Sequence, residues 1–252
     1  EEEEDTDPNH IYLLDGRLMV VDIGSGASEN IGYYSQWAGK RVAWYGDSLT
    51  ELYYHCSLVN QYFGLAAYNC GTRGATVSTH TVSALCTKIR MKLYIGYIPS
   101  DVEAIFIMAG TNDWMQNVPL GTKILTRDAT GAVNTDSTTF YGACHLMFSH
   151  LRELYPNAKI VVFGTPMAMN ADGLYNALGL SAADYGNAMC EIANMWGIEN
   201  FNIGECIQVN LTNCVHGDGY MYEQLHFLEI PSRRAADAII QKLCTTPYQE
   251  GR

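Results

Sequence analysis

The sequence has few positively charged residues. It holds 15 Lys and Arg against 27 Asp and Glu, which gives a formal net charge of −12. Six of the acids lie in the first seven residues, so the rest of the chain, with 15 basic and 21 acidic residues, carries −6. An acidic surface repels nucleic-acid phosphates and anionic lipid headgroups. We therefore expect neither a nucleic acid nor an anionic membrane surface as a partner.

A long apolar run is also missing, since none reaches the roughly 18 residues that a membrane-spanning helix needs. The eight cysteines form no C-x-x-C pair, which argues against a zinc knuckle or a thioredoxin-type site. They are too sparse for a disulfide scaffold and leave the redox compartment open. Apolar residues make up 48% of the chain and charged residues only 17%, a composition typical of a globular protein.

Short apolar runs alternate with segments of helical spacing from residue 41 onward. The runs predict strands over residues 42–45, 65–70, 102–109, 159–163 and 198–203. The intervening segments predict helices over residues 50–63, 77–94, 138–155, 181–196 and 231–243. Five alternations of strand and helix indicate an α/β fold, a five-stranded parallel sheet covered on both faces in a three-layer α/β/α sandwich. Residues 1–40 are interpreted as an acidic, disordered leader and an N-terminal extension that packs on the domain formed by residues 41–252.

Polar clusters follow three of the predicted strands, and a fourth cluster precedes the last helix. They are Gly46-Asp47-Ser48-Leu49, the segment 69–74 (Asn-Cys-Gly-Thr-Arg-Gly), Gly110-Thr111-Asn112-Asp113 and Glu223-Gln224-Leu225-His226. In open α/β sheets such loops meet at one edge, where sites form. Each cluster alone has an ordinary structural explanation: Ser48-x-x-Glu51, for example, matches a helix capping box. Their joint occurrence favours a catalytic site, because four unrelated turns would not need this set of residues.

The set contains what acyl transfer needs. A serine hydroxyl such as that of Ser48 becomes nucleophilic when a base removes its proton, and His226 is suited to that role near neutral pH. Glu223, three residues before the histidine, is placed to accept its other ring N–H. The backbone N–H groups of Ser48 and Gly74 and the side-chain amide of Asn112 are candidate donors to an oxyanion.

The four clusters, in this order, resemble the blocks of the SGNH (GDSL) hydrolase family over residues 41–243. The resemblance implies a flavodoxin-like α/β/α fold, a serine–histidine–acid triad and hydrolysis of esters without a cofactor or metal. Carried over by position, Ser48 is the nucleophile and His226 is the general base. Gly74 matches the oxyanion glycine of the second block, and Asn112 matches the asparagine of the third.

Two positions depart from the family pattern. The acid before His226 is usually Asp, whereas this chain has Glu223, which is one methylene longer, and Asp218 is a rival acid. The Pro that usually follows the histidine is Phe227 here, which leaves open how His226 is presented. His216 is a weaker candidate for the base, because it lies in a Gly/Asp turn without the acid-x-x-His pattern.

Four residues beside these blocks are candidates for contact with substrate: Asp47, Arg73, Asp113 and Trp114. Asp47 has a competing role in holding the strand-to-helix turn through backbone N–H groups. Trp114 could stack on a sugar or acyl group, or it could seal its loop onto the domain.

We therefore expect a serine esterase that acts on short-chain acyl esters, such as acetyl groups on a carbohydrate. An O-acyltransferase would use the same residues. A non-catalytic carbohydrate-binding or structural module of a larger surface or virion protein is the alternative outside enzymes, although such a module has no use for a triad and an oxyanion hole.

Overall fold

The computed structural model describes residues 9–14, 17–22, 36–52, 54–90, 97–131, 133–166, 168, 173–210, 221–222 and 225–246. The acidic leader and the predicted roles of Glu223, Asp218 and His216 concern residues outside these ranges.

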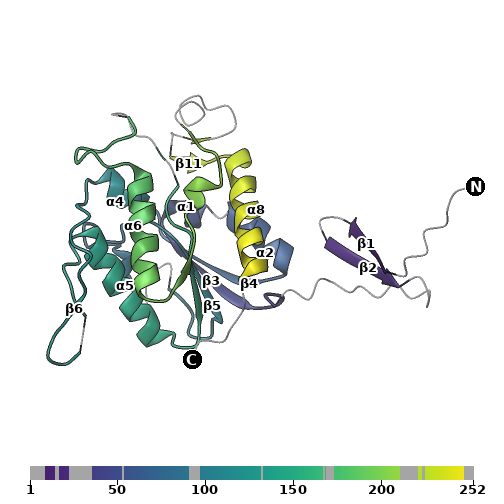
Figure 1. Cartoon of the computed structure of the whole chain (residues 1–252), viewed down its shortest axis with the longest axis horizontal. Coiled ribbons are helices and arrows are strands. Elements are labelled where there is room, and N and C mark those ends of the chain that lie inside the picture. Colours follow the sequence, from purple (N-terminus) through teal and green to yellow (C-terminus); the bar gives the residue numbers. More distant parts are fainter. Residues whose placement is uncertain are drawn as a thin grey trace, which may run out of the picture.

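A five-stranded parallel sheet forms the centre of the domain (Figure 1). Its strands are β3 (Arg41–Gly46), β4 (Ala66–Gly71), β5 (Ala104–Met108), β8 (Lys159–Val162) and β9 (Glu199–Asn200). They lie in the order β4-β3-β5-β8-β9, and every neighbouring pair is parallel. This is the 2-1-3-4-5 order of flavodoxin-like sheets, so the predicted fold class is confirmed.

Helices cover both faces of the sheet (Figure 1). One layer consists of α2 (Tyr54–Phe63) and α8 (Glu229–Thr245), which pack together. The other consists of α3 (Leu85–Lys88), α5 (Phe140–Leu154) and α6 (Ala182–Met195), with α5 in contact with both neighbours. Alternate residues of a strand point to opposite faces. Accordingly, the side chain of Trp44 joins the core under α2 and α8, whereas that of Tyr45 joins the core under α5 and α6.

Shorter elements complete the described fold. Two short helices follow the central strands, α1 (Ser48–Glu51) after β3 and α4 (Thr111–Met115) after β5, and a 3-10 helix, η1 (Ile203–Glu205), follows β9. Three antiparallel pairs lie outside the main sheet: β1 (Asn9–Leu14) with β2 (Arg17–Asp22), β6 (Thr126–Arg127) with β7 (Val133–Asn134), and β10 (Met221–Tyr222) with β11 (His226–Phe227). The N-terminal extension therefore contains a hairpin, and its packing on the domain stays a prediction.

The helix expected over residues 77–94 is wrong in extent, because the described part of this segment contains only α3. The residues before α3 are rich in Thr and Ser, whose hydroxyls bond nearby groups instead of leaving the backbone to a helix. The hydroxyl of Thr76 donates to the carbonyl of Ser78 and also contacts the hydroxyl of Thr81. The helix expected over residues 50–63 is likewise divided into α1 and α2.

No helix among the described residues is both long enough and apolar enough to span a membrane.

We predict that Gly110→Ala lowers the free energy of unfolding by about 2–4 kcal/mol. Gly110 precedes α4 with φ of +118°, and a Cβ there would lie 2.6 Å from the hydroxyl oxygen of Thr165. Gly131→Ala is the matched control, because Gly131 has φ of +82° but a Cβ there would meet nothing within 4 Å. Denaturant unfolding should show a loss of about 1 kcal/mol for the control. Equal losses in the two variants would contradict the contribution of the close contact.

Candidate active site

Ser48 and His226 meet in the structure although 178 residues separate them in sequence. The Nε2 atom of His226 lies 2.9 Å from the hydroxyl oxygen of Ser48, a hydrogen-bond distance. Ser48 is only 5% exposed and His226 is half-buried. A serine and a histidine at this distance have the geometry that a nucleophile–base pair needs.

Ser48 is held at the carboxyl end of β3 by a tight turn. Asp47 is the N-cap of α1, and its Oδ1 atom accepts the backbone N–H of Leu49 at 3.0 Å. The hydroxyl of Thr50 donates to the carbonyl of Met108, which ties α1 to the end of β5. Gly46 lies so close to β5 that a Cβ there would be 1.9 Å from the Met108 oxygen. Ser48 therefore lies in a turn at the end of β3 that is fixed against β5.

His226 is held by the pairing of β11 with β10, in which it lies opposite Tyr222. The next residue, Phe227, is buried in the core between the sheet and α8, and its ring meets the ring of His55 edge to face at a centroid distance of 5.9 Å. This burial explains how the histidine is presented without the proline of the family pattern. Phe227 anchors the strand in the core, and His226, on the opposite side of the strand, faces Ser48.

The candidate oxyanion donors lie on loops that bond to each other. Gly74 has φ of +70°, a left-handed conformation that favours glycine. The side-chain amide of Asn112 donates to the carbonyl of Ala75 at 2.9 Å, so α4 is tied to the residue that follows Gly74. An asparagine amide carries two hydrogens, and this bond uses one of them. This hydrogen bond joins the loop that carries Gly74 to α4.

Asp113 and Asp47 are fully buried and serve the backbone of these loops. The carboxylate of Asp113 accepts the N–H groups of Val77 and Ser78 at 2.7 and 3.0 Å, which fixes the segment after Gly74 against α4. Burial raises the pKa of Asp113 to about 6, although the hydrogen bonds from Ser78 and Val77 oppose the shift. Burial, with a smaller contribution from the charge of Asp113, raises the pKa of Asp47 to about 7 against the hydrogen bond from Leu49.

The burial of these side chains decides between the roles considered for the flanking residues. Trp114 is fully buried, and its indole N–H donates to the carbonyl of Leu180 at 3.0 Å. It therefore seals its loop onto the domain, and the expectation that Asp47, Asp113 and Trp114 line a substrate cleft is corrected by their lack of exposed surface. Among the four candidates only Arg73 is exposed, with 69% of its side chain accessible.

The capping-box interpretation of Ser48-x-x-Glu51 is corrected as well. The N-cap is Asp47, and the Glu51 carboxylate instead accepts the backbone N–H of Arg73. Sequence reasoning missed this contact, because its only signal was a carboxylate three residues after Ser48, which a capping box explains equally well.

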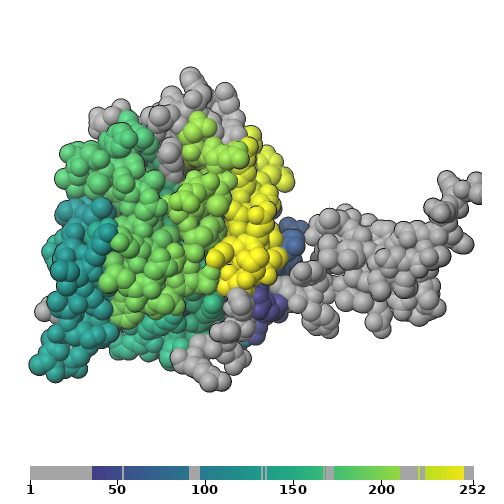
Figure 2. Space-filling model, in the orientation of Figure 1, coloured from purple at the N-terminus to yellow at the C-terminus, as the bar shows by residue number. Residues whose placement is uncertain are grey.

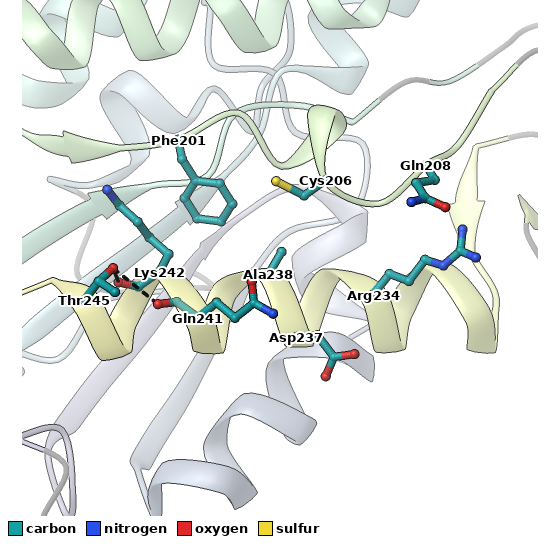
Figure 3. Close-up of a pocket in the computed structure, with 9 residues that line it drawn as sticks. All are labelled: Phe201, Cys206, Gln208, Arg234, Asp237, Ala238, Gln241, Lys242 and Thr245. Atoms are coloured by element: carbon teal, nitrogen blue, oxygen red, sulfur yellow. Dashed lines mark hydrogen bonds between the residues drawn. The ribbon is translucent and has the colours of Figure 1, made fainter.

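A groove of about 510 Å³ lies between α8 and the segment that follows β9 (Figure 3). Figure 2 shows these two parts side by side, α8 in yellow and the segment in light green. Phe201, Arg234 and Lys242 are among its lining residues, and none of the candidate site residues is. Lys242 forms an ion pair with Glu199, so part of the charge at the groove is neutralised.

No group of three or more His, Cys, Asp or Glu side chains within the described part of the chain is arranged to hold a metal ion.

Comparisons with solved structures place this arrangement among known folds. A protein from Lactobacillus plantarum is 21% identical, with a TM-score of 0.66 over 82% of this chain and 97% of its own. A candidate lipolytic protein of the G-D-S-L family from Desulfitobacterium hafniense is 11% identical, with a TM-score of 0.56 over 81% and 99%. The chain has the fold of the SGNH hydrolases. An α/β hydrolase enzyme from the Lake Arreo metagenome is 14% identical, with a TM-score of 0.56 over 83% of this chain and 98% of its own.

No protein-family model matches the sequence, and a search of curated proteins finds no match.

We predict that Asp47→Asn removes a pH-dependent loss of stability. The folded pKa of about 7 lies above the roughly 3.9 of an unfolded aspartate, so the folded state binds more protons between these values. The contribution of Asp47 to the stability of the wild type therefore falls as the pH rises from about 4 to about 7. Asparagine keeps an oxygen for the Leu49 N–H but cannot ionise. The melting temperature of the variant minus that of the wild type should increase from pH 5 to pH 8.

Asp101→Asn is the control for this measurement, since Asp101 is half exposed and pairs with Arg41 at the surface. Its difference from the wild type should stay nearly constant over the same pH range. A constant difference for Asp47→Asn as well would contradict the assignment of the shift to Asp47.

Proposed function

We propose that this protein is a serine esterase of the SGNH family. The observation that carries the proposal is the 2.9 Å contact between the Ser48 hydroxyl and Nε2 of His226, made at the carboxyl end of β3. This strand lies between β4 and β5, at the point where the strand order reverses. Ligands in open α/β sheets bind at such a point. The bond between Asn112 and the carbonyl next to Gly74 adds support, because it brings two candidate oxyanion donors to the same edge.

The chemistry follows from the roles of these groups. His226 takes the proton of the Ser48 hydroxyl as the serine oxygen bonds to the ester carbonyl carbon. The N–H groups of Ser48 and Gly74 and the amide of Asn112 donate hydrogen bonds to the oxyanion. His226 then gives its proton to the leaving alcohol oxygen, and the acyl-enzyme remains. Water attacks this ester with His226 again as the base, which releases the acid and restores Ser48.

The third member of the triad is proposed to be Glu223, with Asp218 as the rival. A carboxylate that accepts the second ring N–H fixes the tautomer of the histidine and stabilises its cationic form. Glu223 lies three residues before His226, and this spacing supports the assignment.

For the substrate we propose a short acyl ester on a polar alcohol, such as an acetyl group on a carbohydrate. Arg73 directly precedes Gly74, the proposed oxyanion glycine, and its side chain is exposed. A guanidinium has five N–H donors, which suit hydroxyl and carboxylate oxygens better than an acyl chain. Transfer of the acyl group to a second alcohol would use the same residues.

We predict that Ser48→Ala lowers kcat for p-nitrophenyl acetate by about 10³-fold or more, because the nucleophile is lost. The wild type should hydrolyse the acetate faster than the butyrate. Thermal unfolding should show that the variant folds like the wild type. Retention of the wild-type rate by Ser48→Ala would rule out the proposed nucleophile, and an acylated acceptor alcohol among the products would assign acyl transfer.

Glu223→Ala is predicted to lower kcat several hundredfold, because the imidazole loses its orienting partner. Asp218→Ala is the matched control, with an expected change of less than about threefold. The same esterase assay measures both variants. A large loss in Asp218→Ala alone would transfer the role to Asp218.

A further inference from the structure

The loop that carries Gly74 is docked on Glu51. The carboxylate of Glu51 accepts the backbone N–H of Arg73, and its other oxygen lies 3.7 Å from the Arg73 guanidinium. The backbone carbonyl of Glu51 accepts the side-chain amide of Asn69 at 2.9 Å. Gly71 lies so close that a Cβ there would be 2.3 Å from the Glu51 nitrogen. Glu51 thus lies against the loop at three positions, Asn69, Gly71 and Arg73.

Two further hydrogen bonds hold the same loop, one from the end of β3 and one from α3. The N–H of Thr72 donates to the carbonyl of Gly46 at 2.9 Å. The ammonium group of Lys88, a buried residue of α3, donates to the Thr72 hydroxyl. The loop is therefore fixed between the end of β3, α3 and the end of α1.

Gly74 itself has no side chain through which packing could position it. A Cβ at Gly74 would meet nothing within 4 Å. The direction of its N–H must therefore depend on the residues before and after it. Asn112 fixes the carbonyl of Ala75 on one side, and Glu51 fixes the N–H of Arg73 on the other.

We infer that Glu51 is a positioning residue for the oxyanion hole, acting through the Arg73 N–H on the N–H of Gly74. The inference rests on the proposed function, because it assigns Gly74 as an oxyanion donor. Oxyanion donors work only when they are aimed at the developing charge, and the loss of one lowers kcat by about 10²–10³-fold. Displacement of the donor should therefore lower kcat more than it changes KM.

The bond to the backbone, and not the ion pair, is the part of this contact that positions the loop. The side chains of Arg73 and Glu51 are 69% and 36% exposed, and exposed ion pairs contribute little. Arg73→Ala would remove the guanidinium but keep the N–H that Glu51 accepts. Glu51→Gln would remove the charge but keep an acceptor oxygen. The two variants therefore separate the backbone bond from the ion pair.

The test compares kcat per titrated active site for Glu51→Ala, Glu51→Gln and Arg73→Ala with p-nitrophenyl acetate. We expect Glu51→Ala to lose about 10–100-fold in kcat with less than about a threefold change in KM. Glu51→Gln should recover most of the loss in kcat. Because Arg73 is proposed to contact substrate, Arg73→Ala can raise KM, but its loss in kcat should be at least about fivefold smaller than that of Glu51→Ala. Glu153→Ala removes the exposed ion pair with Arg90 and is the control for a change of surface charge.

Hydrogen exchange gives a second measurement that does not depend on activity. The amide of Arg73 should exchange about tenfold or more faster in Glu51→Ala than in the wild type, while amides of β5 keep their protection. Two results for Glu51→Ala would overturn the inference. One is a smaller fraction of titratable active sites with an unchanged kcat per site, and the other is an unchanged rate of hydrogen exchange at the Arg73 amide. Activity that survives Ser48→Ala would instead overturn the proposed function, so the two failures are distinguishable.

Discussion

The parallel pairing of β3 with β4 and β5 is the constraint on which the rest of the site depends. Gly46, the last residue of β3, lies opposite Gly71 on one side and Met108 on the other. Three strands therefore end at the same level, and the three loops that follow them begin within reach of one another. A slip of one residue in either pairing would move Ser48 away from the Gly74 loop or from α4, and it would also reverse which side chains enter each core.

The loops at this edge are held mainly by polar groups that are themselves buried. Asp47 and Asp113 accept hydrogen bonds from backbone N–H groups in the interior. Burial of the two carboxylates disfavours their charged form, which is why their pKa values are raised. Buried carboxylates contribute less to stability than an apolar core would, but they fix the direction of the groups that they bond. This edge of the sheet is therefore less stable than an apolar edge would be, but its geometry is better defined, which is common at functional sites.

The sequence predicted the sheet well, because buried parallel strands leave continuous apolar runs such as residues 104–108. The pairing of Ser48 with His226 was predicted from the order of four polar blocks. The helix predicted over residues 77–94 was wrong in extent, since Thr76 and its neighbours bond locally in a way that spacing does not encode. The roles of Glu51 and Phe227 were not predicted, because they depend on contacts with distant segments. Local sequence patterns predict helices and strands, whereas the role of an individual side chain depends on contacts with residues far away in the sequence.

The distance in sequence between Ser48 and His226 has a consequence for biosynthesis. During translation Ser48 leaves the ribosome long before His226, and α2 also appears well before α8, against which it packs. A nascent chain that lacks β11 therefore holds Ser48 without His226. Their hydrogen bond can form only after β11 has been synthesised.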